Sequence, residues 1–326
     1  MNSIFLSISS PIIKTQIHSL NSNELKFYRN PFFLCVPLQK SITLVQFSPQ
    51  CSASTSKPPT SREEAILQAK VSLSSTLDKP LNNPKLAAGK LKKVKQPRFR
   101  VEVPIINDSV SSLTQLAIEV FGDLPTKRKN PKIKIVFLWP DQSFAQAATK
   151  AFEEISSVSV IESVDICTVL DQDSRTLSSA DALVFMAPEV TELETIKKVV
   201  ESLYPKPVVM FNPKWTFEEE SNFDEMRSFL GSFDVVYSFM GLEVRGLLSK
   251  RKGVIFKCVK DGVLSGEKWN VLVEEGEELK VVSRFSTRPS IAEVENVLYN
   301  YMAVNSPITK SAKFLKDLVS NVTGKK

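Results

Sequence analysis

The chain has 326 residues, and its 42 basic and 36 acidic side chains give a formal net charge of +6. The only histidine, His18, lies in an N-terminal segment that we expect to be removed, so catalytic triads and metal sites that need imidazole are excluded from the mature chain. No apolar run reaches the roughly 18 residues that a membrane-spanning helix requires.

The N-terminal segment is rich in serine and almost free of acid. Residues 1–57 hold one acidic side chain, Glu24, against five basic ones. This composition predicts an organelle transit peptide over residues 1–56, with an ordinary disordered tail as the alternative. Because the segment contains four prolines and no sustained amphipathic helix, we expect the chloroplast rather than the mitochondrion as its destination, with the protein in the stroma or peripheral to the thylakoid membrane.

The remaining charge is unevenly distributed. Without residues 1–57 the chain keeps 37 basic and 35 acidic side chains, a net charge of +2. Seven of the basic residues fall in one acid-free stretch, so everything else is mildly acidic: Lys85, Lys90, Lys92, Lys93, Lys95, Arg98 and Arg100. A basic arm on an acidic body argues against a nucleic-acid-binding protein. The arm is suited to an anionic membrane surface, and a solvated linker is the alternative.

The first predicted elements follow this N-terminal segment. Residues 61–77 begin with Ser61 before two glutamates and carry an apolar stripe, which predicts a helix, and a basic linker extends to residue 97. In residues 99–105 apolar and polar side chains alternate, which predicts a half-buried strand. Residues 108–121 have helical spacing, with Asp108 or Ser109 as the cap and Gly122 as the end.

From Pro131 onward, short apolar runs alternate with helical segments. Strands are predicted within 132–140, 160–170, 181–188, 206–213 and 234–239, and helices follow Asp141, Glu189 and Thr216. This order predicts an α/β fold over residues 98–326, with a mostly parallel, Rossmann-like sheet covered by helices on both faces. Three later runs with glycine turns predict an antiparallel meander, and helices over 290–302 and 307–322 end the chain.

Two cysteines and three tryptophans are expected to be structural. Cys167 and Cys258 lie in apolar, strand-like contexts without a CxxC partner, so we expect small core residues rather than a disulfide framework or a zinc site, with an inter-strand redox pair as the alternative. Tryptophan side chains are more often core or rim residues than a binding platform. This expectation applies to Trp139, Trp215 and Trp269.

Ligands of an open α/β sheet bind beyond the carboxyl ends of its strands. The loops there contain prolines where a phosphate-binding turn needs glycines, and neither GxGxxG nor GxxxxGK[ST] occurs. Four side chains would meet at this edge, where they would hold a polar ligand or else cap and pack: Asp141, Asn212, Lys214 and Trp215. Asp141 is also well placed as an N-cap.

A second candidate surface is basic. Arg245, Lys250, Arg251 and Lys252 cluster before a strand, either as a partner surface or as a charged hairpin turn that protects an edge. The sequence assigns no catalytic residue, no metal and no cofactor.

Several blocks resemble a plant and cyanobacterial domain-of-unknown-function family, over nearly all of the mature chain. They are VPIINDSVSSLTQLAIEVFGDLP, FNPKWTFEEE, SFDVVYSFMGLEVRGLLSKRKGVIFKCVKDG and the C-terminal RPSIAEVENVLYNYMAVNSPITKSAKFLKDLVSN. The resemblance implies a non-enzymatic chloroplast factor for photosystem II assembly, whose partners are a chlorophyll-binding core subunit or the thylakoid insertion and assembly factors. A related domain is appended to a plastid adenylate kinase. The alternative is therefore a plastid enzyme or regulator that binds a nucleotide or phosphorylated metabolite at the carboxyl edge.

Overall fold

The structure is a computed structural model that describes residues 57–82, 95–104, 107–125, 132–154, 160–169, 175–245, 250–276 and 278–305, without the side chains of 243–245, 250 and 251. The predicted transit peptide, most of the basic linker and the predicted helix at 307–322 lie outside these residues. Among the described helices, none is both long enough and apolar enough to cross a membrane.

The strands form the predicted mostly parallel sheet with an antiparallel end. Their order in the described chain is β3-β2-β4-β5-β1-β6-β7-β8-β9. The contacts divide the chain into a larger unit, which runs to Gly241 and includes Phe256–Glu267, and a smaller unit formed by Leu242–Ile255 and the residues from Lys268 onward. The single-domain boundary predicted at residue 98 stays a prediction.

The larger unit contains the parallel strands. They are β1 (Arg98–Glu102), β2 (Lys134–Trp139), β3 (Val160–Asp165), β4 (Ala182–Met186), β5 (Val208–Phe211) and the part of β6 (Asp234–Arg245) up to Gly241. Every residue of β4 and β5 is buried, because helices cover both faces of these strands. Their continuous apolar runs are the sequence pattern that such burial requires.

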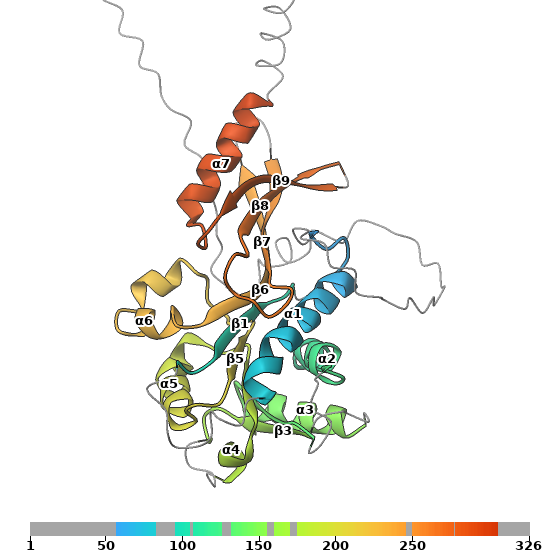
Figure 1. Ribbon diagram of the computed structural model, residues 1–326, viewed down its shortest axis with the longest axis vertical. Coiled ribbons are helices and arrows are strands. Elements are labelled where there is room, and N and C mark those ends of the chain that lie inside the picture. The colour runs from blue at the N-terminus through green and yellow to red at the C-terminus, as the bar shows by residue number, and fades with distance from the viewer. Residues whose placement is uncertain are drawn as a thin grey trace, which may run out of the picture. The chain divides into compact units, whose positions relative to one another are not determined.

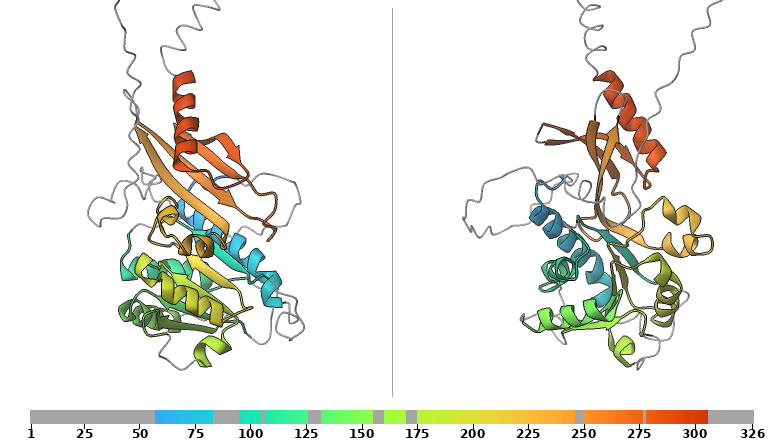
Figure 2. Two further views of the ribbon diagram at one scale, coloured as in Figure 1. Left: turned by 90° about the vertical axis from the view of Figure 1, so that its left-hand side faces the viewer. Right: turned by 180° about the vertical axis from the view of Figure 1, so that it is seen from behind.

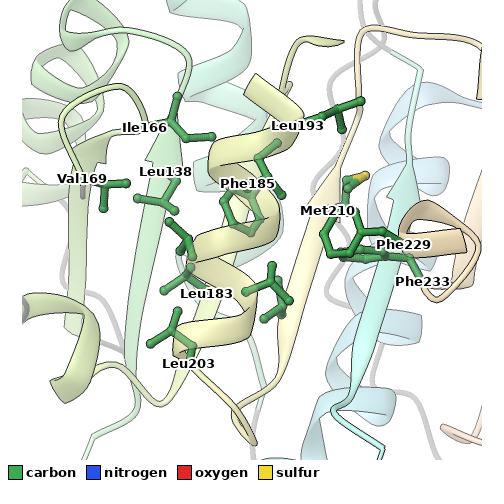
Figure 3. Close-up of a cluster of buried hydrophobic side chains, with 14 of the residues drawn as sticks. Leu138, Ile166, Val169, Leu183, Phe185, Leu193, Leu203, Met210, Phe229 and Phe233 are labelled. Carbon is green, nitrogen blue, oxygen red and sulfur yellow. The ribbon is translucent and has the colours of Figure 1, made fainter. Parts of the chain in front are cut away.

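The helices lie on two faces of this sheet (Figure 1), as the right-hand view of Figure 2 also shows from behind. One face carries α1 (Arg62–Asn82), α2 (Val110–Phe121) and α3 (Gln142–Glu153). The other face carries α5 (Leu193–Ser202) and α6 (Met226–Leu230). The remaining helical elements of this unit are short: α4 (Arg175–Ser179) and the 3₁₀ turns η3 (Val190–Glu192) and η4 (Glu219–Asn222). On the first face the ring of Phe121 packs edge-on against Phe137 and Phe211. On the second, α5 and α6 cover apolar side chains that include Leu183, Phe185 and Met210 (Figure 3).

Helix α1 is an integral part of the larger unit. Its inner side is buried at Ala65, Ala69, Leu73 and Leu77, and its Ser72 hydroxyl donates to the Val236 carbonyl at 2.8 Å. The chain after β7 also approaches α1 closely: a Cβ at Gly262, whose φ is +66°, would lie 2.4 Å from the Ser75 carbonyl oxygen. Only glycine avoids both the strained φ and this clash.

The smaller unit confirms the predicted meander and the helix that follows it. It holds the last four residues of β6 from Leu242, the first part of β7 (Lys250–Cys258), β8 (Trp269–Glu275), β9 (Glu278–Phe285) and α7 (Ile291–Val304). Strands β8 and β9 pair in the antiparallel sense around Gly276, whose φ is +66°. Ser290 caps α7 in a reciprocal pair of hydrogen bonds with Glu293, as expected for a Ser-x-x-Glu sequence.

Three sequence expectations are wrong. Strand β1 is not half-buried: Arg100 and Glu102 are buried together with the apolar residues, because they pair with each other. Arg98 and Arg100 therefore belong to the strand and not to a basic arm. Cys167 is exposed in the turn after β3, whereas Cys258 is buried as expected; both are free thiols. All three tryptophans are buried, as predicted.

Candidate functional site at the carboxyl edge

The four side chains predicted at the sheet edge all lie in loops that follow the carboxyl ends of β2 and β5. Strand β2 leads into α3 on one face, whereas its neighbour β4 leads into η3 and α5 on the other. Adjacent strands whose connections diverge in this way open the crevice where ligands of such folds bind. The structure nevertheless gives each of the four side chains a partner within the protein.

Asp141 caps helix α3. Its carboxylate accepts hydrogen bonds from the backbone N–H groups of Ser143 at 2.8 Å and Phe144 at 3.2 Å, and from the Ser143 hydroxyl at 2.5 Å. The pKa of this exposed carboxyl is lowered, first by the Ser143 hydroxyl and further by the backbone bonds and by Lys214. The capping alternative predicted for Asp141 is confirmed.

Lys214 pairs with Glu189, which lies in the loop after β4. Its ammonium is 2.6 Å from the Glu189 carboxylate, and its own backbone N–H donates to Pro188 at 2.9 Å. The Glu192 carboxylate in turn accepts from the Glu189 backbone N–H at 2.6 Å. Burial, followed by the negative charge of Glu189, raises the pKa of Glu192 to about 7, against the backbone bond and Lys214.

Glu189 and Glu192 were not among the residues expected to form this site. The spacing Glu-x-x-Glu at the start of a predicted helix was the signal for them, because an acceptor side chain three residues into a helix reaches back to the cap. The burial of Glu192, and hence its raised pKa, depended on the neighbouring loops, whereas Glu189 stays about half exposed.

Asp165, the last residue of β3, and Cys167, in the turn that follows, extend the same edge. The Asp165 carboxylate accepts from the Cys167 backbone N–H at 2.8 Å. The pKa of the Cys167 thiol is raised, first by desolvation and then by the negative charges of Asp165, Glu192 and Asp141. A thiol whose pKa is raised by carboxylates holds little thiolate at neutral pH, so it is a weak nucleophile and a weak metal ligand.

Asn212 joins the ends of two strands. Its side-chain amide accepts from the Val103 N–H at 2.7 Å and donates to the Val103 carbonyl at 2.9 Å, which continues the β1–β5 pairing beyond the strands. Its φ of +47° is one that asparagine tolerates better than most residues. Both ends of this amide are thus occupied by backbone.

Trp215 belongs to a buried charged network that the sequence did not predict. The Trp215 indole N–H donates to the Glu220 carboxylate at 3.0 Å, and Arg100 pairs with this same carboxylate. On its other side the Arg100 Nε lies 2.7 Å from Glu102, which accepts from the Ser238 hydroxyl at 2.5 Å. We refer to these five residues as the Arg100 network. Its two carboxylates share one guanidinium in a site closed to water.

The second predicted surface is only partly described. Arg245 lies at the end of β6, and Lys250, Arg251 and Lys252 lie in β7. Lys252 is exposed, and the side chains of the other three are outside the described part of the structure. The basic cluster stays a prediction. Within the described ranges, no group of three or more His, Cys, Asp or Glu side chains is arranged to hold a metal ion.

Comparisons with known proteins identify one family. The model of a family described as "Domain of unknown function (DUF1995)" matches residues 59–296, from the start of α1 into α7. No curated protein matches the chain.

Proposed function

The chain belongs to the DUF1995 family. We propose that it is a non-enzymatic chloroplast factor that assists the assembly of photosystem II. It would act by binding a chlorophyll-binding core subunit or the thylakoid machinery that inserts this subunit. The observation that carries the proposal is the resemblance of four sequence blocks, over nearly all of the mature chain, to the family member called low PSII accumulation protein three. The acid-poor N-terminus supports chloroplast import.

The electrostatics of the carboxyl edge weigh against the alternative, a site for a nucleotide or phosphorylated metabolite. Four carboxylates, those of Asp141, Asp165, Glu189 and Glu192, gather there with one ammonium, that of Lys214. If all are ionised, the net charge is −3. Phosphate groups are bound by arginine, lysine and free backbone N–H groups, and a set dominated by carboxylates repels them.

The proposal is tested in the chloroplast. The tagged full-length protein is expressed in a line that lacks the endogenous one, recovered from thylakoids in mild detergent, and its partners are identified by mass spectrometry. In parallel, newly made photosystem subunits are pulse-labelled in the mutant and in the complemented line.

We expect photosystem II core subunits or insertion factors to co-purify, and photosystem II assembly to be slow in the mutant and restored by the transgene. Normal labelling kinetics in the mutant would contradict the proposal. So would slowing of every thylakoid complex to the same degree, because this would indicate a general defect.

A further inference from the structure

The edge strand β3 and helix α3 line a pocket that has no part in the function proposed above. It measures about 230 Å³ and lies in the larger unit, on the face of the sheet that α3 covers. Its polar lining comes from α3, from β3 and from the turn after β3: Gln142, Gln146, Thr149, Ser163, Asp165 and Thr168.

The side of α3 that lines the pocket is polar, whereas the side of a helix that packs on a sheet is ordinarily apolar. Gln142, Gln146 and Thr149 lie at spacings of four and three residues and so share the side of α3 that faces the pocket. Opposite them, Ser163 and Asp165 alternate along β3 and point to the same face. The Ser163 hydroxyl is buried and has no hydrogen-bond partner among the described residues.

The outer edge of β3 offers backbone hydrogen bonds beside this pocket. Val160 and Ile166 donate their N–H groups to β2, to Ile133 at 2.8 Å and Trp139 at 2.9 Å. In a parallel pair alternate residues bond the same neighbour, so the N–H and C=O groups of Ile161, Ser163 and Asp165 point away from β2. In the described part of the chain β3 is the last strand on that side of the sheet.

The charge around the pocket selects a cation. The one charged side chain in its lining is the Asp165 carboxylate. The amide and hydroxyl oxygens of the lining add acceptors for a group with several N–H donors. A guanidinium matches this combination better than an ammonium because it presents five N–H donors in a planar fork.

The volume of the pocket fits one side chain better than a drug-sized ligand. Pockets for drug-sized molecules measure roughly 300–1,000 Å³, and this one measures about 230 Å³. An extended peptide added to β3 would direct alternate side chains toward the α3 face, next to the pocket.

We propose that β3 and the α3–β3 pocket form a docking site for an extended segment of a partner protein, which adds a strand to the sheet and inserts one arginine side chain into the pocket. Backbone hydrogen bonds to Ile161, Ser163 and the N–H of Asp165 supply affinity, since the Asp165 carbonyl already accepts from the Thr168 hydroxyl at 3.5 Å, and the guanidinium between Asp165 and Ser163 supplies specificity. This inference rests on the proposal above that the chain acts by binding a protein client.

The test uses the full chain and a fluorescent seven-residue peptide with one arginine at the centre of alternating threonine and valine. Binding is measured by fluorescence anisotropy. Three further probes are a peptide with norleucine in place of arginine, a peptide N-methylated on alternate amides, and free ethylguanidinium as a competitor. Asp165→Asn and Ser163→Ala remove the charge and the acceptor from the pocket. Asp234→Asn is the matched control, because it removes one carboxylate from the amino end of β6 in the same unit.

We expect norleucine and Asp165→Asn each to weaken binding by about ten-fold or more, since each removes a charge-assisted hydrogen bond. Ser163→Ala should weaken binding by a smaller factor and Asp234→Asn by less than about two-fold, because its charge is remote and screened. N-methylation should weaken binding by about ten-fold, because it blocks strand addition.

Three results would overturn the inference: equal binding of the arginine and norleucine peptides, equal effects of Asp165→Asn and Asp234→Asn, or undiminished binding of the N-methylated peptide. If ethylguanidinium competes as strongly as the peptide binds, the pocket takes a free cation and strand addition is refuted. Circular dichroism of each variant checks that it is folded. The assay contains no photosystem protein, so its failure is distinguishable from failure of the chloroplast experiment.

Discussion

Replacing Arg100 with methionine tests whether the Arg100 network holds the loop after β5 against the sheet. The methionine keeps most of the apolar stem and removes the guanidinium that Glu102 and Glu220 share. Their side chains are only 11% and 9% exposed, so water replaces little of the lost partner. Burial lowers the pKa of Arg100, but the two carboxylates outweigh it and raise the pKa above its ordinary value. The cation is therefore fully charged and strongly bound.

The expected loss follows from these contacts. Breaking a buried ion pair by removing one partner costs about 3–5 kcal/mol. The Ser238 hydroxyl and the Trp215 indole still donate to the two carboxylates, so we expect a value near the lower end, about 3 kcal/mol.

Urea unfolding of the full chain, followed by tryptophan fluorescence, measures the change in the free energy of unfolding. Lys95→Met is the control, because Lys95 and its partner Asp234 are 69% and 42% exposed at 3.4 Å, and such a pair contributes at most about 1 kcal/mol. The triple variant Arg100→Met, Glu102→Gln, Glu220→Gln should recover most of the loss, because no charge remains buried. If Arg100→Met costs no more than Lys95→Met, or if the triple variant is no more stable than the single one, the account of the network is refuted.

Glu192 and Asp141 give two further predictions. The pKa of Glu192 rises from 4.5 to about 7 on folding, so between these pH values the folded state binds more protons than the unfolded state, and the protein loses stability as pH rises through this window. Glu192→Gln should therefore stabilise the protein by about 1–3 kcal/mol at pH 8 and leave its stability unchanged at pH 4. Urea unfolding at both pH values measures this difference. Equal effects at the two pH values would contradict this reasoning. Asp141→Ala should lower stability by about 0.5–2 kcal/mol and Asp141→Ser by much less, because serine also caps α3. The Asp141 pKa is lowered in the folded state. The stability difference between wild type and Asp141→Ala should therefore shrink as pH falls below 4. Equal losses in both variants would show that capping is not the role of this side chain.

Local sequence patterns predicted most of the elements because each pattern reports burial within one segment. The apolar runs of β2, β4 and β5, the Ser290 cap of α7 and the glycine turn between β8 and β9 need no distant residue to be recognised. The alternation of strands and helices then restricts the architecture to a parallel sheet with two covered faces. The positions of Asp141, Asn212, Lys214 and Trp215 at the carboxyl edge followed from the same logic.

What those side chains do was decided only by tertiary contacts. Arg100 and Glu102 alternate with apolar residues as solvent-facing side chains do, yet they are buried because Glu220, 120 residues away from Arg100, completes their network. The raised pKa of Glu192 and the pocket between α3 and β3 likewise depend on loops and strands that meet only in the folded chain. The spacing of apolar residues along a segment determines which face of its helix or strand is covered. The pairing of charges and the space left between elements are set by residues that are distant in sequence.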